Sequence, residues 1–253
     1  MCRKLWKPED IEFVFSSYND FEERLLSFLK VIPYNETNKN VWSPELVSLF
    51  LDICGLIDSM SRYILGQGKV GIKRKVKVFN KEGREIEKEI TKLNIVDFEL
   101  NIFNKLKLEK YQVILYIYSV YPDCVITPYK DYRKKEEWWT VYNKLKHNRL
   151  DNYKDANIHN ILKSLSALFL LIITYDKSEE LTLAMLRHGW IDTNWVPEAV
   201  HRERIQQPES YWCDTDLFGS GFYLKDLLVE KLEDVTALIA GKKFTNFIGQ
   251  ANR

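Results

Sequence analysis

The chain has 253 residues, of which 45% are hydrophobic and 13% aromatic, enough for a buried core in one large domain or two small ones. Its 37 basic and 36 acidic residues nearly cancel, so the protein as a whole has no field that attracts nucleic acid or acidic lipid. Binding of either would require a local patch of charge. The composition argues against a disordered chain and against a protein that is basic throughout.

The four cysteines, Cys2, Cys54, Cys124 and Cys213, are widely separated. No pair has C-x-x-C spacing, which argues against a zinc knuckle, a redox dithiol or a disulfide scaffold and fits a reducing cytosol. The first ten residues, MCRKLWKPED, lack the apolar segment of a secretory signal. The longest apolar run, 167–173, is far shorter than the roughly 18 residues that a membrane span requires. We therefore expect a cytoplasmic protein that does not enter a membrane.

Two helices are predicted in the first third of the chain. Asn19 can cap a helix whose apolar residues recur at spacings of three and four and which ends near Pro33. The triplet Ser-Pro-Glu at 43–45 combines an N-cap, a proline at the first helical position and an acid in the first turn. It predicts a second helix that continues to Ile64.

The pattern between residues 70 and 90 changes to a short alternation of apolar and charged residues, which predicts an exposed, charged β-hairpin. A helix is expected over 95–106. The aromatic and β-branched run YQVILYIYSVYPDCVITPY then predicts two strands with a turn at 121–123. The chain would thus carry one or two small β insertions, near 70–90 and 111–130.

Three further helices are predicted after these strands. The segment WWTVYNKLKHNRL, residues 138–150, is expected to be one helix, and residues 156–175 form a second with an apolar inward face. The short connection between them predicts an antiparallel pair. A third helix over 178–189 would complete the bundle. Residues 191–253 are expected to be a C-terminal appendage whose terminal helix, 224–239, packs on the bundle.

The helix expected over 138–150 carries a compact polar cluster beside an apolar stripe. The two tryptophans, Tyr142 and Leu145 fall on the apolar side, whereas Asn143, Lys146 and His147 are neighbours on a polar side. A lysine beside a histidine favours the neutral imidazole, which can accept a proton, and the lysine itself can hold a phosphate. The cluster fits cleavage of a phosphodiester without metal. A histidine with a purely structural bond at a helix end would give the same pattern.

Other polar residues give weaker indications. Asp58 and Arg62 are four apart on a predicted helix and can form an exposed ion pair, while Arg149 points away from the polar cluster. Asp214 and Asp216 could bind a hard cation, but acidic turn residues usually cap backbone groups. No P-loop, dinucleotide-binding or serine-hydrolase motif is present, and no histidine cluster has metal-ligand spacing. We therefore expect neither a metal nor a cofactor.

Two parts of the chain are similar to a known family. The helix SPELVSLFLDICGLIDSMSRYIL and the later WWTVYNKLKHNRLDNYKDANIHNILKSLSALFLL resemble the HEPN-like helical domains of bacteria and archaea, in particular a branch with a W-x-x-Y-N-x-x-K-H-x-R signature. The resemblance covers roughly residues 17–190. It implies a mainly α fold, an up-and-down antiparallel helical bundle over residues 1–190 with the β-hairpins as insertions, and commonly a homodimer.

For the active members, the resemblance implies metal-independent cleavage of RNA, often in a toxin–antitoxin or antiviral defence system. His147 would then be the general base or acid, Lys146 would bind phosphate, and Asn143 would orient the histidine or the substrate. Active members typically carry an arginine four to six residues before the histidine. Here Arg149 follows His147 instead.

Supporting residues are also implied by the resemblance. Asp58 is the nearest substitute for an acidic residue that the family often carries in the early helix, and Arg62 or Arg149 would assist in binding phosphate. Many HEPN-like domains are not catalytic, so a module that dimerises, binds RNA or holds an antitoxin or defence protein is the alternative. A third function, RNA binding by the basic arm GKVGIKRKVKV, competes with a solvated sheet edge.

Overall fold

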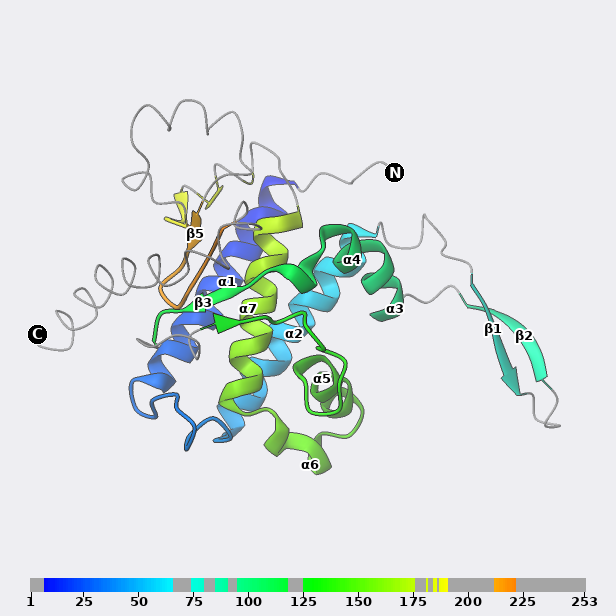
Figure 1. Ribbon diagram of the computed structural model, residues 1–253, viewed down its shortest axis with the longest axis horizontal. Coiled ribbons are helices and arrows are strands. Elements are labelled where there is room, and N and C mark those ends of the chain that lie inside the picture. The colour runs from blue at the N-terminus through cyan, green and yellow to red at the C-terminus, as the bar shows by residue number, and fades with distance from the viewer. Residues whose placement is uncertain are drawn as a thin grey trace, which may run out of the picture.

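The computed structural model describes residues 7–65, 74–79, 85–90, 95–117, 125–175, 181, 184–185, 187–190 and 212–221 (Figure 1). These residues are mainly helical, with a small antiparallel sheet of four strands and a separate two-stranded hairpin. The expectation of a mainly α fold with small β elements is confirmed.

Helix α1, Pro8–Leu29, begins well before the Asn19 cap that the sequence suggests. Pro8 occupies the first turn, and Glu9 and Asp10 follow it at the positive end of the helix dipole. Asn19 lies inside the helix, where its side chain amide contacts Nδ1 of His188 at 3.3 Å. The predicted start was wrong because an asparagine inside a helix resembles a cap when the partner of its side chain is unknown.

Helix α2, Pro44–Ile64, begins as predicted. Oγ of Ser43 accepts a hydrogen bond from the amide of Leu46 at 3.1 Å, and Pro44 occupies the first helical turn. The apolar residues that follow at helical spacing are buried against α1 and α7. The N-cap and the spacing of the apolar residues predict this helix, and the same two features stabilise it in the structure.

Helix α7, Ile158–Tyr175, is buried along nearly its whole length and packs against α1 and α2. The amides of Ile158 and His159 donate to the carbonyls of Val41 and Lys39, immediately before α2. The two helices therefore start at the same end of the molecule and run in the same direction, while α1 runs the opposite way (Figure 1). The up-and-down antiparallel order does not hold for α2 and α7, because the chain between them crosses back to the starting end.

By length and composition alone, α7 is also the one described helix that could cross a membrane. Most of it, 89% of the apolar window, is buried inside the protein. Such burial is what the core helix of a water-soluble bundle shows, since a membrane helix presents its apolar side chains to lipid.

The segment predicted as a helix over 95–106 is helical over that range but not uniform. It consists of α3, Ile95–Phe98, a π-helical turn η1, Glu99–Phe103, and α4, Asn104–Leu106. A short 3-10 turn, η2, Leu108–Lys110, follows. A π-helical turn inside an α-helix shifts the side chains that follow it around the helix axis.

The predicted hairpin near 70–90 is confirmed as β1, Arg74–Phe79, paired antiparallel with β2, Glu85–Ile90. The second predicted pair is also present, as β3, Val113–Leu115, and β4, Val125–Ile126. The turn expected at 121–123 lies outside the described residues.

The second pair of strands belongs to a larger sheet. Its strand order is β4-β3-β6-β5, in which β5, Trp212–Asp214, and β6, Phe218–Gly221, come from the expected C-terminal appendage. Ile114 in β3 pairs with Gly219 in β6. The sequence does not reveal this pairing, because strands distant along the chain carry no local signal of their partner.

Helix α5, Trp138–His147, is shorter than expected. Asn148 leaves the helical conformation with φ −147° and ψ 81°, and the chain continues as α6, Arg149–Asn152, and the 3-10 turn η3, Tyr153–Asp155. In Figure 1, α5 is seen nearly end-on, whereas α7 runs from the bottom of the bundle to its top. The two helices therefore do not form the antiparallel pair that their short connection predicts.

The helix expected over 178–189 is described only in part. Residues 181, 184, 185 and 187 are helical, and Gly189, with φ 71°, ends this stretch as predicted. The terminal helix expected over 224–239 lies outside the described residues. The part of the basic arm that precedes β1 also lies outside them.

Candidate functional site

Helices α2 and α5 bring three of the predicted site residues together. Nε and Nη2 of Arg62 each donate to the carboxylate of Asp58 at 3.0 Å, a two-pronged ion pair. Nζ of Lys146, from α5, lies 3.8 Å from the same carboxylate. The side chains of Asp58 and Arg62 are 15% and 32% exposed, so the pair is partly buried rather than exposed as expected.

Aromatic rings support both cations of this cluster. Nζ of Lys146 lies 3.5 Å from the hydroxyl of Tyr142 and 5.3 Å from the centre of its ring. The guanidinium of Arg62 lies 5.6 Å from the centre of the Phe98 ring, a cation–π distance. Burial, with the charge of Asp58 second, raises the pKa of Tyr142 to about 12. The phenol therefore stays protonated near neutral pH and can donate a hydrogen bond but cannot act as a base.

Asn143 and His147 lie on the same helix, but the described contacts do not join them to the ion cluster. Nδ2 of Asn143 donates to the carbonyl of Trp139 at 3.1 Å, which uses part of its amide within its own helix. His147 is the last residue of α5 and is exposed. None of the described hydrogen bonds or ion pairs involves His147, so its ring is open to a ligand from solvent.

Arg149 opens α6 beyond the break at Asn148. Its side chain is exposed and makes no described contact with Asp58 or Lys146. Because α5 ends at His147, Arg149 does not lie on the helix that carries Lys146.

The charges of this site sum to a positive value. Among the described ion pairs, two cations, Arg62 and Lys146, share one carboxylate, Asp58, which gives these three side chains one net positive charge, and the exposed His147 follows Lys146 in the chain. A phosphate diester carries one negative charge and accepts hydrogen bonds from lysine and arginine. The site can therefore receive a phosphodiester, with an imidazole nearby that is able to exchange protons.

The turn that contains Asp214 and Asp216 is held by Glu22 of α1. The amides of Asp216 and Leu217 donate to Glu22 of α1 at 3.3 and 3.1 Å, and the hydroxyl of Thr215 donates to the same carboxylate. Among the residues that the structure describes, no group of three or more His, Cys, Asp or Glu side chains is placed to hold a metal ion.

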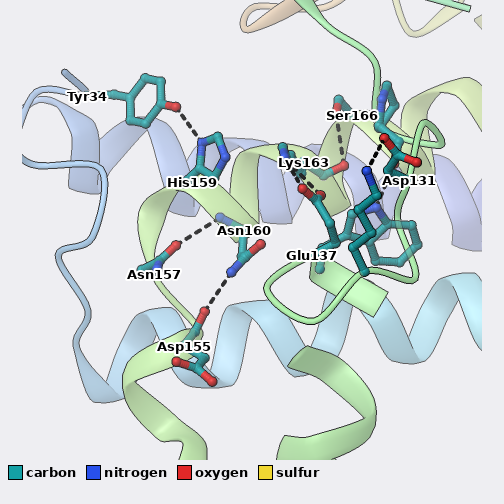
Figure 2. Close-up of polar contacts among 12 residues, drawn as sticks. Tyr34, Asp131, Glu137, Asp155, Asn157, His159, Asn160, Lys163 and Ser166 are labelled. Atoms are coloured by element: carbon teal, nitrogen blue, oxygen red, sulfur yellow. Dashed lines mark hydrogen bonds and ion pairs between the residues drawn. The ribbon is translucent and has the colours of Figure 1, made fainter. Parts of the chain in front are cut away.

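His159 contributes to the anchoring of α7 (Figure 2). Its Nδ1 and the hydroxyl of Tyr34 form a hydrogen bond of 2.7 Å. Burial, followed by the charge of Lys163, lowers the pKa of His159 to about 4. Nearby, Nζ of Lys163 donates to both carboxylate oxygens of Glu137 at 2.9 Å and so links α7 to the start of α5.

Two residues of the site were not predicted from the sequence. Tyr142 was assigned to the buried stripe alone and Phe98 to no site, although both rings lie under cations. A signal existed for Tyr142, which precedes Lys146 by one helical turn; none existed for Phe98, which comes from another helix. Comparisons with protein-family models, with curated proteins and with solved structures found no match to this chain.

Proposed function

We propose that this protein is a HEPN-like, metal-independent RNA endonuclease that binds a phosphodiester between α2 and α5. The observation that supports this proposal is the convergence of Arg62 and Lys146 on Asp58 next to an exposed histidine at the end of α5. The family resemblance lies in the same two helices.

Each residue of the cluster has a distinct role in this proposal. Asp58 holds Arg62 in place and keeps its positive charge near the site. Lys146 is held less tightly, at 3.8 Å from Asp58 and with a half-exposed side chain, so it can turn toward a phosphate without breaking a short ion pair. Tyr142 supports the lysine through its hydroxyl and its ring.

His147 is the proton-transfer group in this mechanism. The 2′ hydroxyl of RNA gives its proton to the imidazole, and the 2′ oxygen attacks the adjacent phosphorus. The 5′ oxygen leaves with a proton from water, and the imidazolium returns its proton to the hydroxide that remains, so the product is a 2′,3′-cyclic phosphate. Lys146 stabilises the negative charge that develops on the phosphoryl oxygens.

A second function, RNA or protein binding without catalysis, is favoured by one specific observation. Catalytic histidines are usually oriented by a bond from their second ring nitrogen, whereas the described contacts of this protein include none for His147. In that case the cluster of Asp58, Arg62 and Lys146 would serve only to bind RNA or a partner such as an antitoxin or a defence protein.

The proposal also includes a homodimer that brings two copies of His147 near one RNA. The purified protein would then have twice the chain mass of 30.1 kDa in light scattering. A monomeric mass at micromolar concentration would remove the dimer from the proposal.

Cleavage of a mixed RNA pool in excess EDTA tests the catalytic proposal. We expect 2′,3′-cyclic phosphate ends from the wild-type protein and a loss of at least roughly 100-fold in rate for His147→Ala, the usual contribution of a proton-transfer group. Lys146→Ala should slow cleavage and weaken RNA binding. Lys154→Ala, which removes an exposed lysine on η3, is the matched control and should change little.

The same experiment separates the two functions. RNA binding that Lys146→Ala weakens, without cleavage by any variant, would favour the non-catalytic module. If His147→Ala cleaves as fast as the wild-type protein, the histidine has no catalytic role and the nuclease proposal fails.

A further inference from the structure

A pocket of about 490 Å³ lies between η1, α4, η2 and the loop that precedes α5. Its volume falls within the range of small-molecule sites, roughly 300–1,000 Å³. None of the residues assigned to the proposed nuclease site lines it.

Irregular backbone forms the walls of this pocket. Glu99 and Phe103 are the two ends of the π-helical turn η1, and Asp131, in the facing loop, has a positive φ of 59°. Both features cost conformational energy and are enriched where side chains must be aimed at a ligand. Both features therefore favour a ligand-binding role for the side chains that line the pocket.

Three aromatic side chains, Phe103, Tyr129 and Tyr132, give the pocket its apolar part. They pack on one another with ring centres 4.8 to 5.8 Å apart. The hydroxyl of Tyr129 donates to the carbonyl of Ala167 at 3.0 Å. The hydroxyl of Tyr132, a residue 6% exposed, is buried without a hydrogen-bond partner among the described residues. This oxygen is shielded from the pocket as well as from bulk solvent, so a ligand in the pocket does not reach it.

The charged side chains at the rim are largely paired. Arg133 pairs with Glu99, and Nζ of Lys134 lies 2.9 Å from the carboxylate of Asp131. Both cations of the pocket are therefore neutralised. Glu109 also lines the pocket but takes part in no described hydrogen bond or ion pair, so it leaves one net negative charge.

We infer that this pocket binds a small organic cation, an ammonium or guanidinium group on a short apolar body. Glu109 is the exposed carboxylate of the pocket that no described cation pairs, and a carboxylate only accepts hydrogen bonds, so the ligand supplies donors. Its apolar body lies against the aromatic part of the pocket, where the rings also attract positive charge. A bare metal ion fits poorly, because only one free carboxylate is available.

Calorimetric titration with agmatine and putrescine at constant ionic strength tests this inference. We expect saturable binding, no binding of the neutral analogue 1,4-butanediol, and a loss of roughly tenfold or more in affinity for Glu109→Gln. Glu136→Gln, at an exposed acid outside the pocket, is the matched control and should bind like the wild-type protein. Asn104→Asp adds a negative charge at an exposed wall position and should tighten binding.

Agmatine and a blocked peptide, acetyl-Gly-Gly-Arg-Gly-Gly-amide, distinguish two sources of the same chemical group. Tighter binding of agmatine assigns the pocket to a free small cation, and tighter binding of the peptide assigns it to an arginine side chain of a protein. Absence of binding by every cation up to about 10 mM, or equal affinity of Glu109→Gln and the wild-type protein, would overturn the inference.

Discussion

At the scale of single residues, Asp58 is the carboxylate that joins the two cations of the ion cluster, Arg62 and Lys146. Its carboxylate accepts both bonds of Arg62 and lies next to Lys146, while its side chain is mostly shielded from solvent. Removing one partner from such a group leaves the others desolvated and unpaired, which costs more than the loss of an exposed pair. The position of Asp58 therefore links the stability of the fold to the charge of the site.

We expect Asp58→Asn to lower the free energy of unfolding by about 1–3 kcal/mol, because an amide cannot neutralise two cations. Urea unfolding followed by tryptophan fluorescence measures this loss. Asp52→Asn, on the same helix, is the control: Asp52 lies 3.3 Å from Arg24, but its side chain is 48% exposed, so the loss should be about 0–1 kcal/mol. Equal losses for the two variants would contradict the role given to Asp58.

The sequence predicts part of this residue-level picture. The spacing of four residues on a helix is enough to pair Asp58 with Arg62, and the pair is present. Lys146 joins them from α5, and Phe98 lies under Arg62 from α3. These neighbours are set by helix packing, about which the spacing of residues in one helix carries no information.

At the scale of elements, the turn between β5 and β6 is held on α1 by one buried carboxylate. Glu22 accepts hydrogen bonds from two backbone amides and the Thr215 hydroxyl of this turn, and the hydroxyl of Tyr18 lies 3.4 Å away. Burial, only partly offset by the hydrogen bonds from Thr215 and Leu217, raises the pKa of Glu22 to about 7. The attachment of the sheet to α1 therefore depends on pH.

The direction of this dependence follows from the raised pKa. The folded protein holds a proton on Glu22 more tightly than the unfolded chain, whose pKa is near 4.5, so this stabilisation is complete below pH 4.5 and is lost as pH rises through 7. Between pH 4.5 and 8, the wild-type protein should lose up to about 3 kcal/mol of unfolding free energy relative to Glu22→Gln, whose amide does not titrate.

Urea unfolding of both proteins across this pH range measures the difference. Glu23→Gln, which neutralises the exposed neighbour of Glu22 on α1, is the control and should follow the wild-type pH dependence. A constant difference between the wild-type protein and Glu22→Gln at all pH values would show that Glu22 does not titrate in this range.

Elements with strong local signals were predicted well. The Ser43 cap of α2, the two strand pairs and the glycine end at Gly189 are present. The predicted start of α1 and the predicted end of α5 were wrong. Both errors involve an asparagine: Asn19 lies within a helix that it was expected to begin, and Asn148 ends a helix that was expected to continue. An asparagine does either according to the contacts of its side chain.

At the scale of the whole molecule, the small sheet connects chain segments that the sequence suggests are separate. Strand β6 lies between β3 and β5, and Phe218, its first residue, and the preceding Leu217 are fully buried. Strand β3 would lose a paired neighbour without β6, and Glu22 would lose all three donors of the turn. The described part of the C-terminal region therefore contributes to the main core.

We expect a chain ending at Trp190 to lose at least about 3–6 kcal/mol of unfolding free energy, from the burial of Leu217 and Phe218 alone. Urea unfolding of the shortened chain, with Trp fluorescence as the signal, measures the loss. Low solubility would agree with an uncovered edge of β3. An unchanged unfolding midpoint would show that residues 191–253 are an independent appendage.

The sequence alone determined the mainly helical class, the N-cap of α2, the lengths of α2 and α7 to within a few residues, both predicted strand pairs and the Asp58–Arg62 pair. These features depend on spacing and on contacts within a few residues. Only the tertiary structure decided that α2 and α7 run in the same direction and that β6 pairs with β3. It also placed Lys146 beside Asp58 and left His147 exposed at a helix end, because these contacts join residues that are distant along the chain.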